Sequence, residues 1–259
     1  MKHFNMLIKS TIVFIVSIFI LQFFVIGCAG DKKLAHNIIS ATFSPDNTLC
    51  LQDTSGFELC KIDTSGKIVN CQRIEIPEVD DAFLIAADAA HNKYFYAAAD
   101  SVFMFDRTTG LTRTMTRGAF AENARCARVS PDGKFLAFSA SKWELGNISY
   151  WRLVVVDAVE GGIIHYCDSL VSFDAFQWVG SEKLGYAELW NANGKFDTLG
   201  MFFNTKRRVV IPTRDRAIDF LKIPCNPNLS YDGVWFIDIV DSVANVEKLH
   251  SIEQNIQNP

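Results

Sequence analysis

The chain has 259 residues, of which 25 are Lys or Arg and 29 are Asp or Glu, and its formal net charge is −4. Without its first 27 residues, which hold two of the lysines, the chain is more acidic still. This balance weighs against a surface that binds nucleic acid. Residues 28–259 have the length of one ordinary domain.

The N-terminal segment has the pattern of a secretory signal. Lys2 and Lys9 precede an apolar run over residues 11–27 that only Ser17 and Gln22 interrupt. A cationic start, an apolar middle and a small residue at the end are typical of such signals. The run is nearly long enough to span a bilayer, so an uncleaved membrane anchor and an ordinary cleaved signal are alternatives to a lipoprotein signal.

The end of this run, Val25-Ile26-Gly27-Cys28, resembles a bacterial lipobox, although Ile26 stands where Ala or Ser is usual. The resemblance implies that a peptidase cuts before an acylated Cys28. Residues 1–27 are then a signal peptide and residues 28–37 a tether. We therefore expect a protein that is lipid-anchored in the bacterial cell envelope, on the outer membrane facing the periplasm, because two or more acyl chains hold a protein durably.

A four-residue turn pattern recurs along the rest of the chain. The copies are Ser44-Pro45-Asp46-Asn47, Ala89-Ala90-His91-Asn92, Ser130-Pro131-Asp132-Gly133, Val179-Gly180-Ser181-Glu182 and Ser230-Tyr231-Asp232-Gly233, and they begin 41 to 51 residues apart. Proline fixes φ, Asp bonds back to the backbone and Gly accepts a positive φ, so the pattern predicts a tight turn between two strands. A period of roughly 40–50 residues is typical of one β-propeller blade.

Short extended runs flank these turns. Residues 126–129 precede the clearest copy and residues 135–139 follow it, and both runs are too short for helices. No long amphipathic helical pattern follows residue 35. The chain is therefore predicted to be all-β, with a β-propeller of about five four-stranded antiparallel blades in residues 38–259. The last blade looks short, and we expect a strand near residues 34–40 to complete it.

The third copy resembles a known repeat. Residues 127–138 read A-R-V-S-P-D-G-K-F-L-A-F, and the strand Leu153-Val154-Val155-Val156-Asp157 and a turn at Gly161-Gly162 follow. This is similar to the TolB-type propeller repeat, A-R-W-S-P-D-G-K-x-I-A-F followed by I-Y-V-x-D and a Gly-Gly turn. Copies of varying quality cover about residues 38–250. The resemblance implies the propeller fold but no reaction, because such repeats occur in periplasmic binding proteins and in the propeller domains of prolyl-peptidase-like enzymes.

The cysteines of the first blade allow several interpretations. A three-residue turn at residues 54–56 predicts that Cys50 lies opposite Cys60, and a two-residue turn at residues 65–66 predicts that Cys60 lies opposite Cys71. These residues are small apolar core residues, or one of the two pairs forms a disulfide, or they bind a metal. We expect no metal site, since no close Cys or His pair has ligand spacing.

The sequence contains no motif of a hydrolase, zinc protease, nucleotide-binding loop or dinucleotide-binding fold. His91 falls in a turn and His165 in an outer strand, where structural roles are commoner than catalytic ones. The Asp of each repeated turn is best explained as a turn cap. We therefore predict no catalytic residue and no cofactor.

Two tryptophans are candidates for a binding surface. Trp143 and Trp190 fall in segments that join the second and third strands of the third and fourth blades, and we expect both segments to be loops on one face of the propeller. Local packing is the alternative for both. The favoured function is a non-enzymatic, membrane-tethered module that binds an envelope protein, peptide or glycan. The alternative is a propeller-fold enzyme that acts on a glycan or peptide.

Overall fold

The computed structural model describes residues 38–54, 56–75, 82–145, 148–192, 195–213, 230–231, 235–240 and 243–248. The predicted signal peptide at residues 1–27 and the tether with Cys28 at residues 28–37 lie outside the described residues. Within the described ranges, no helix has the length and apolar character needed to cross a membrane.

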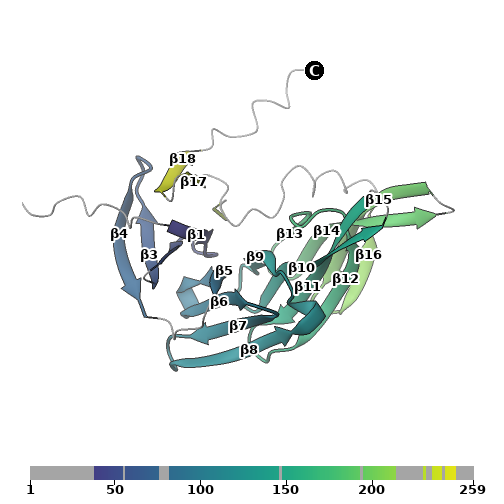
Figure 1. The fold of residues 1–259 in the computed structure, drawn as a ribbon, viewed down its shortest axis with the longest axis horizontal. Helices are drawn as coiled ribbons and strands as arrows, with labels where there is room; N and C mark the ends of the chain where they lie inside the picture. The colour runs from purple at the N-terminus through teal and green to yellow at the C-terminus, as the bar shows by residue number, and fades with distance from the viewer. Residues whose placement is uncertain are drawn as a thin grey trace, which may run out of the picture. The chain divides into compact units, whose positions relative to one another are not determined.

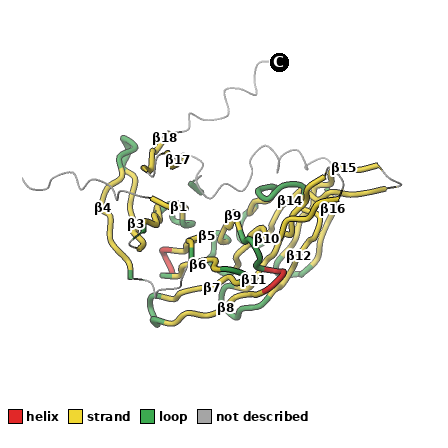
Figure 2. Tube along the Cα trace, viewed as in Figure 1, coloured by secondary structure: helices red, strands yellow, loops and turns green. Residues whose placement is uncertain are grey.

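Strands dominate the described residues, and the helical elements among them are two short 3₁₀ helices (Figures 1 and 2). The first blade consists of β1 (Ile38–Phe43), β2 (Leu49–Asp53), β3 (Gly56–Ile62) and β4 (Ile68–Ile74). The second consists of β5 (Phe83–Asp88), β6 (Lys93–Ala98), β7 (Ser101–Asp106) and β8 (Leu111–Arg117), with η1 (Ala89–His91) after β5 and η2 (Gly118–Phe120) after β8. In both blades each strand pairs antiparallel with the next strand along the chain.

The third and fourth blades repeat this plan. The third consists of β9 (Arg125–Val129), β10 (Phe135–Leu145), β11 (Ile148–Asp157) and β12 (Ile163–Leu170), and the fourth of β13 (Phe176–Trp178), β14 (Lys183–Ala192), β15 (Lys195–Asn204) and β16 (Val209–Pro212). One pairing, Leu170 with Glu188, joins the two blades into an eight-stranded sheet. Finally, β17 (Trp235–Val240) pairs with β18 (Val243–Lys248). The fold is the all-β, antiparallel four-stranded architecture of a β-propeller.

The expected closing strand differs from what the structure shows. Ile38 and Ser40 belong to β1, where they pair with Asp53 and Gln52 of β2 in the first blade. Residues 34–37, the remainder of the expected strand, lie outside the described residues.

The first four copies of the repeated pattern each connect the first two strands of a blade, and Asp232 and Gly233 of the fifth copy lie outside the described residues. In the third blade Gly133 has φ of 72° and donates its N–H to the carbonyl of Ser130 at 2.8 Å. The side chain of Asp132 accepts from Ser130 Oγ at 2.7 Å and from the N–H of Lys134 at 3.4 Å. Asp132 is therefore a cap within its own turn, as the sequence indicates.

The hydrophobic core lies between neighbouring blades. In β11 four consecutive side chains, Leu153, Val154, Val155 and Val156, are fully buried. Val154 and Val156 pack with residues of the second blade such as Phe95, whereas Leu153 and Val155 pack with residues of the fourth blade. Both faces of the strand are therefore covered, and this explains why its sequence is continuously apolar rather than alternating.

Polar contacts also join the first two blades. Gln52 of β2 donates from Nε2 to the carbonyl of Ala82 at 2.9 Å and accepts from the N–H of Leu84 at 2.7 Å. Ser44 Oγ accepts from the N–H of Ala89 at 2.8 Å. The side chains of Gln52 and Ser44 are buried, and these bonds satisfy them across the gap between blades.

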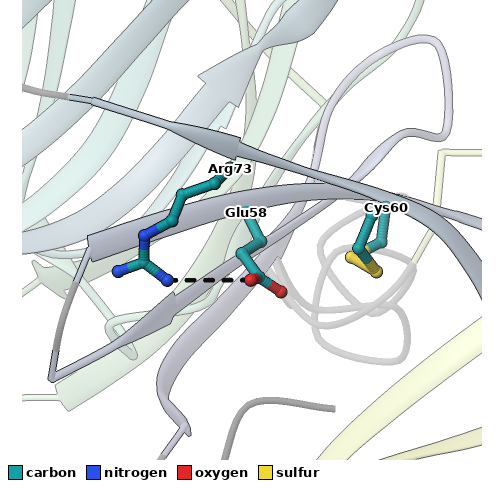
Figure 3. Close-up of a disulfide and its surroundings, with 4 residues drawn as sticks. Glu58, Cys60 and Arg73 are labelled. Atoms are coloured by element: carbon teal, nitrogen blue, oxygen red, sulfur yellow. Dashed lines mark ion pairs between the residues drawn. A yellow bond between two sulfur atoms is a disulfide. The ribbon is translucent and has the colours of Figure 1, made fainter. Parts of the chain in front are cut away.

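A disulfide joins Cys60 of β3 to Cys71 of β4, with the two Cα atoms 4.1 Å apart (Figure 3). The predicted alignment of Cys50 with Cys60 is wrong. Gly56 belongs to β3 and pairs with Asp53, so the preceding turn is one residue shorter than expected and the register shifts by one. Cys50 is consequently paired with Leu59, and its thiol is free and buried.

Cys60 lies beside Cys71 as the sequence predicts, but a longer turn and a β-bulge produce this alignment. Five residues, not two, separate β3 from β4, because the last strand pair is Ile62 with Ile68. Asp63 closes this longer turn by accepting from the N–H groups of Ser65 and Lys67. A β-bulge with Asn70 at φ of 54° then restores the register.

Candidate binding surface

The hairpins of the third and fourth blades are longer than those of the first two. Strands β10 and β11 pair as far as Leu145 with Ile148, and β14 and β15 pair as far as Ala192 with Lys195. These four strands have 10 or 11 residues, whereas those of the second-blade hairpin, β6 and β7, have 6 each. The expected loops at Trp143 and Trp190 are therefore continuous strands, and only two residues connect each pair.

Trp143 and Trp190 occupy equivalent positions on these hairpins. Trp143 pairs with Tyr150 and Trp190 with Asp197, and each is the third pair from the connecting turn. The side chain of Trp190 is on the surface, with 44% of the residue exposed. The structure describes the backbone of Trp143 but not its side chain. The pairing of Leu170 with Glu188 places both hairpins in one sheet, in which β12 lies between β11 of the first hairpin and β14 of the second.

A groove lies at β12, apart from the two tryptophans. A groove of about 490 Å³ is lined by Phe120, Ile163, Ile164, His165 and Tyr166. Tyr166 is 51% exposed, and its ring packs edge-on against Phe120 with centroids 5.1 Å apart. The lining is thus apolar and aromatic, which is typical of binding sites.

Three ionisable groups near this groove, His165, Cys167 and Tyr186, are held in their neutral forms. Burial lowers the pKa of His165 to about 4, and its Nε2 lies 3.1 Å from the hydroxyl of Tyr186. Burial, with the Glu188 carboxylate adding to it, raises the pKa of the Cys167 thiol to about 12, and burial also raises the pKa of Tyr186. A nucleophilic thiol needs the opposite shift. At neutral pH the cluster therefore offers hydrogen-bonding and packing groups but no activated nucleophile.

The first turn of the second blade contains His91, for which the sequence favoured a structural role, and this residue is paired with Asp88. Asp88 is 2% exposed at its side chain and its Oδ2 lies 2.8 Å from Nδ1 of His91, whose side chain is 57% exposed. A carboxylate that accepts from Nδ1 fixes the orientation of the imidazole ring. Gly133 of the next blade approaches so closely that an added Cβ would lie 2.2 Å from Asp88 Oδ2 and 2.8 Å from His91 Nδ1.

Tyr231 connects turns of the first and third blades. Its N–H donates to Asn47 Oδ1 at 2.8 Å, and its hydroxyl donates to the carbonyl of Val129 at 2.7 Å. The guanidinium of Arg128 lies 3.8 Å from the centroid of its ring. The repeated turns are therefore positioned by contacts between blades as well as within them.

Most of these groups carry no signal in a single sequence. The groove joins Phe120 to a strand more than forty residues away, and only the packing of η2 against β12 reveals it. The spacing of Asp88 and His91 can be read from the sequence, but the close approach of Gly133 to both side chains cannot.

No protein-family model matches the chain, and no curated protein matches it. Among solved structures, TolB from Acinetobacter baumannii is similar with 16% identity and a TM-score of 0.39, over 70% of this chain and 43% of that one. A catalytically inactive virginiamycin B lyase from Staphylococcus aureus, solved with quinupristin, has 12% identity and a TM-score of 0.40, over 86% of this chain and 72% of that one.

The β-propeller domain of the Trilobed protease from Pyrococcus furiosus has 17% identity and a TM-score of 0.32, over 69% of this chain and 42% of that one. This chain therefore spans less than half of the TolB chain and of the protease domain. These matches identify no ligand for this chain. The fold assignment rests on the strand pairing described above.

Proposed function

We propose that this chain is a membrane-tethered envelope lipoprotein whose propeller is a non-catalytic module that binds an envelope protein, peptide or glycan. The observation that carries the proposal is the matched pair of long hairpins, with Trp143 and Trp190 at the same register position. Neither extension is needed to complete a blade, because the second blade is complete with strands of 6 or 7 residues. An exposed Trp supplies large contact area at small entropic cost, because its side chain has only two rotatable bonds.

The state of the ionisable groups supports binding over catalysis. The His165–Tyr186–Cys167 cluster adjoins the groove and is neutral at pH 7 for the reasons given above. His165, the member of this cluster that lines the groove, therefore presents a neutral ring to a ligand. The membrane location rests on the lipobox resemblance that ends at Cys28.

The test is capture of envelope components by immobilised protein. Trp190→Ala and Trp143→Ala are each expected to weaken capture by about 2 kcal/mol, roughly 30-fold in Kd, with little change in Tm. Leu111→Ala is the matched control, because Leu111 is an exposed apolar residue, 68% exposed, on β8 of another blade. If all three variants capture envelope components equally well, the long hairpins do not form the binding surface.

The second candidate is a propeller-fold enzyme acting on a glycan or peptide, and the Asp88–His91 pair favours it. The buried carboxylate orients an accessible imidazole in the manner of a general base. If this pair is catalytic, turnover of a glycan or peptide substrate by the wild type would disappear in His91→Ala and fall strongly in Asp88→Asn. If the binding function is correct, His91→Ala retains full capture and no substrate in such a panel is consumed.

A further inference from the structure

We propose that reduction of the Cys60–Cys71 disulfide creates a site for a thiophilic divalent cation such as Zn²⁺, with Glu58, Cys60 and Cys71 as protein ligands. The two sulfur atoms and a carboxylate oxygen of Glu58 all lie within 4.8 Å of one another. This inference is independent of the proposed binding function, since it concerns the β3–β4 hairpin of the first blade.

The hairpin brings the three side chains to one face. Glu58 and Cys60 are two residues apart on β3, and alternate residues of a strand point to the same side. Arg73, directly opposite Glu58 in the register, is two residues from Cys71 on β4 (Figure 3). The bulge at Asn70 places Cys71 beside Cys60, with Cα atoms 4.1 Å apart.

The geometry needs only a small adjustment to hold a cation. Zinc binds sulfur at about 2.3 Å and carboxylate oxygen at about 2.0 Å, so tetrahedral coordination separates neighbouring ligand atoms by about 3.5–3.8 Å. That separation lies within the 4.8 Å over which the three ligand atoms are already grouped. Side-chain rotation after reduction therefore suffices without a change of strand register. Three protein ligands leave one position for water.

The surrounding charges are compatible with this site. Two thiolates, one carboxylate and Zn²⁺ sum to −1, and the neighbouring Arg73–Asp53 ion pair adds no net charge to the site. Arg73 lies 3.7 Å from Glu58 but also 3.4 Å from Asp53, whose side chain is 7% exposed. Arg73 therefore keeps a carboxylate partner when Glu58 turns to the cation.

The chemistry balances with an external dithiol or phosphine as reductant. Reduction adds two electrons and two protons to the disulfide and gives two thiols. Binding of the cation displaces both thiol protons, so affinity rises with pH. The disulfide has no thiolate to donate, so the oxidised protein does not bind the cation at this site.

Cys50 provides an internal control. Cys50 belongs to β2 and is paired with Leu59 of β3, so its side chain points to the same face of the sheet as Leu59. Because neighbouring residues of a strand point to opposite faces, Cys60 is on the other face. Burial also raises the pKa of the Cys50 thiol far above the ordinary value. We expect Cys50→Ser to leave the cation site intact.

The test uses the full chain, Co²⁺ as a spectroscopic probe and a phosphine as reductant. The reduced wild type is expected to bind one Co²⁺ with a thiolate-to-cobalt charge-transfer band, and added Zn²⁺ abolishes the band. Oxidised wild type and Cys60→Ser/Cys71→Ser give no such band. Glu58→Gln weakens binding at least about tenfold, whereas Glu160→Gln, at an exposed turn of the third blade, has no effect.

Circular dichroism on each reduced sample separates loss of the site from loss of the fold. A folded, reduced wild type without stoichiometric cobalt–thiolate absorption overturns the proposal. So does an equal signal from Cys60→Ser/Cys71→Ser, because other cysteines would then be the ligands. If reduced wild type unfolds, a band that persists and is insensitive to Glu58→Gln also overturns it.

Discussion

Substituting Gly133 tests the contact between the turns of the second and third blades. Gly133 has φ of 72°, and an added Cβ would lie 2.2 Å from Oδ2 of buried Asp88. Gly110 is the matched control, with φ of 70° and nothing within 4 Å of an added Cβ. Both alanine variants share the cost of a positive φ, roughly 1–2 kcal/mol, partly offset by the reduced entropy of the unfolded chain.

The difference between the two variants isolates the close approach. In Gly133→Ala, Asp88 must move and its hydrogen bonds to His91 break, which adds about 2 kcal/mol. We expect urea denaturation to show a loss of about 3 kcal/mol for Gly133→Ala and about 1 kcal/mol for Gly110→Ala. If the two losses agree within about 0.5 kcal/mol, which is near the precision of such comparisons, the turns of these blades do not meet.

Three further outcomes are expected. Cys28→Ala should lose metabolic labelling by a palmitate analogue, and persistent labelling would show that Cys28 is not the acylated residue. His165 stays neutral down to about pH 4 when folded but gains a proton near pH 6.5 when unfolded, so its contribution to stability is lost as pH falls through this window. Compared with His165→Gln, the wild type should lose about 2 kcal/mol more between pH 7 and pH 4, after allowance for solvent screening, and parallel pH profiles would contradict the burial of His165. Cys60→Ala/Cys71→Ala should lower the free energy of unfolding by about 3 kcal/mol through the 11-residue loop, and an unchanged denaturation midpoint would indicate that the bridge constrains nothing.

The repeated turns made the blade architecture predictable from sequence. Pro, Asp and Gly act through local backbone geometry, so the turn at residues 130–133 could be recognised without knowledge of tertiary contacts. The run Leu153–Val156, which is rich in β-branched valine, likewise indicated a strand, and it belongs to β11. That both faces of this strand are covered was learned only from the structure.

Register was less predictable, because it depends on single residues at turns and bulges. Gly56 joined β3 instead of the turn, which moved Cys50 away from Cys60. The expected loops at Trp143 and Trp190 were extended strands for a similar reason, because pairing continues to the last two residues of each hairpin. The groove at β12 combines Phe120 with residues of β12, so no local sequence pattern predicts it.

Site-specific photo-crosslinking in intact cells tests the binding role of the long hairpins most directly. A photoreactive amino acid at position 190 or 143 is expected to give the same discrete crosslinked product. The same probe at position 111, on the exposed β8 strand, is expected to give none. Crosslinks at position 111 that match those at positions 143 and 190, or no product at either hairpin position, would contradict a binding surface formed by these hairpins.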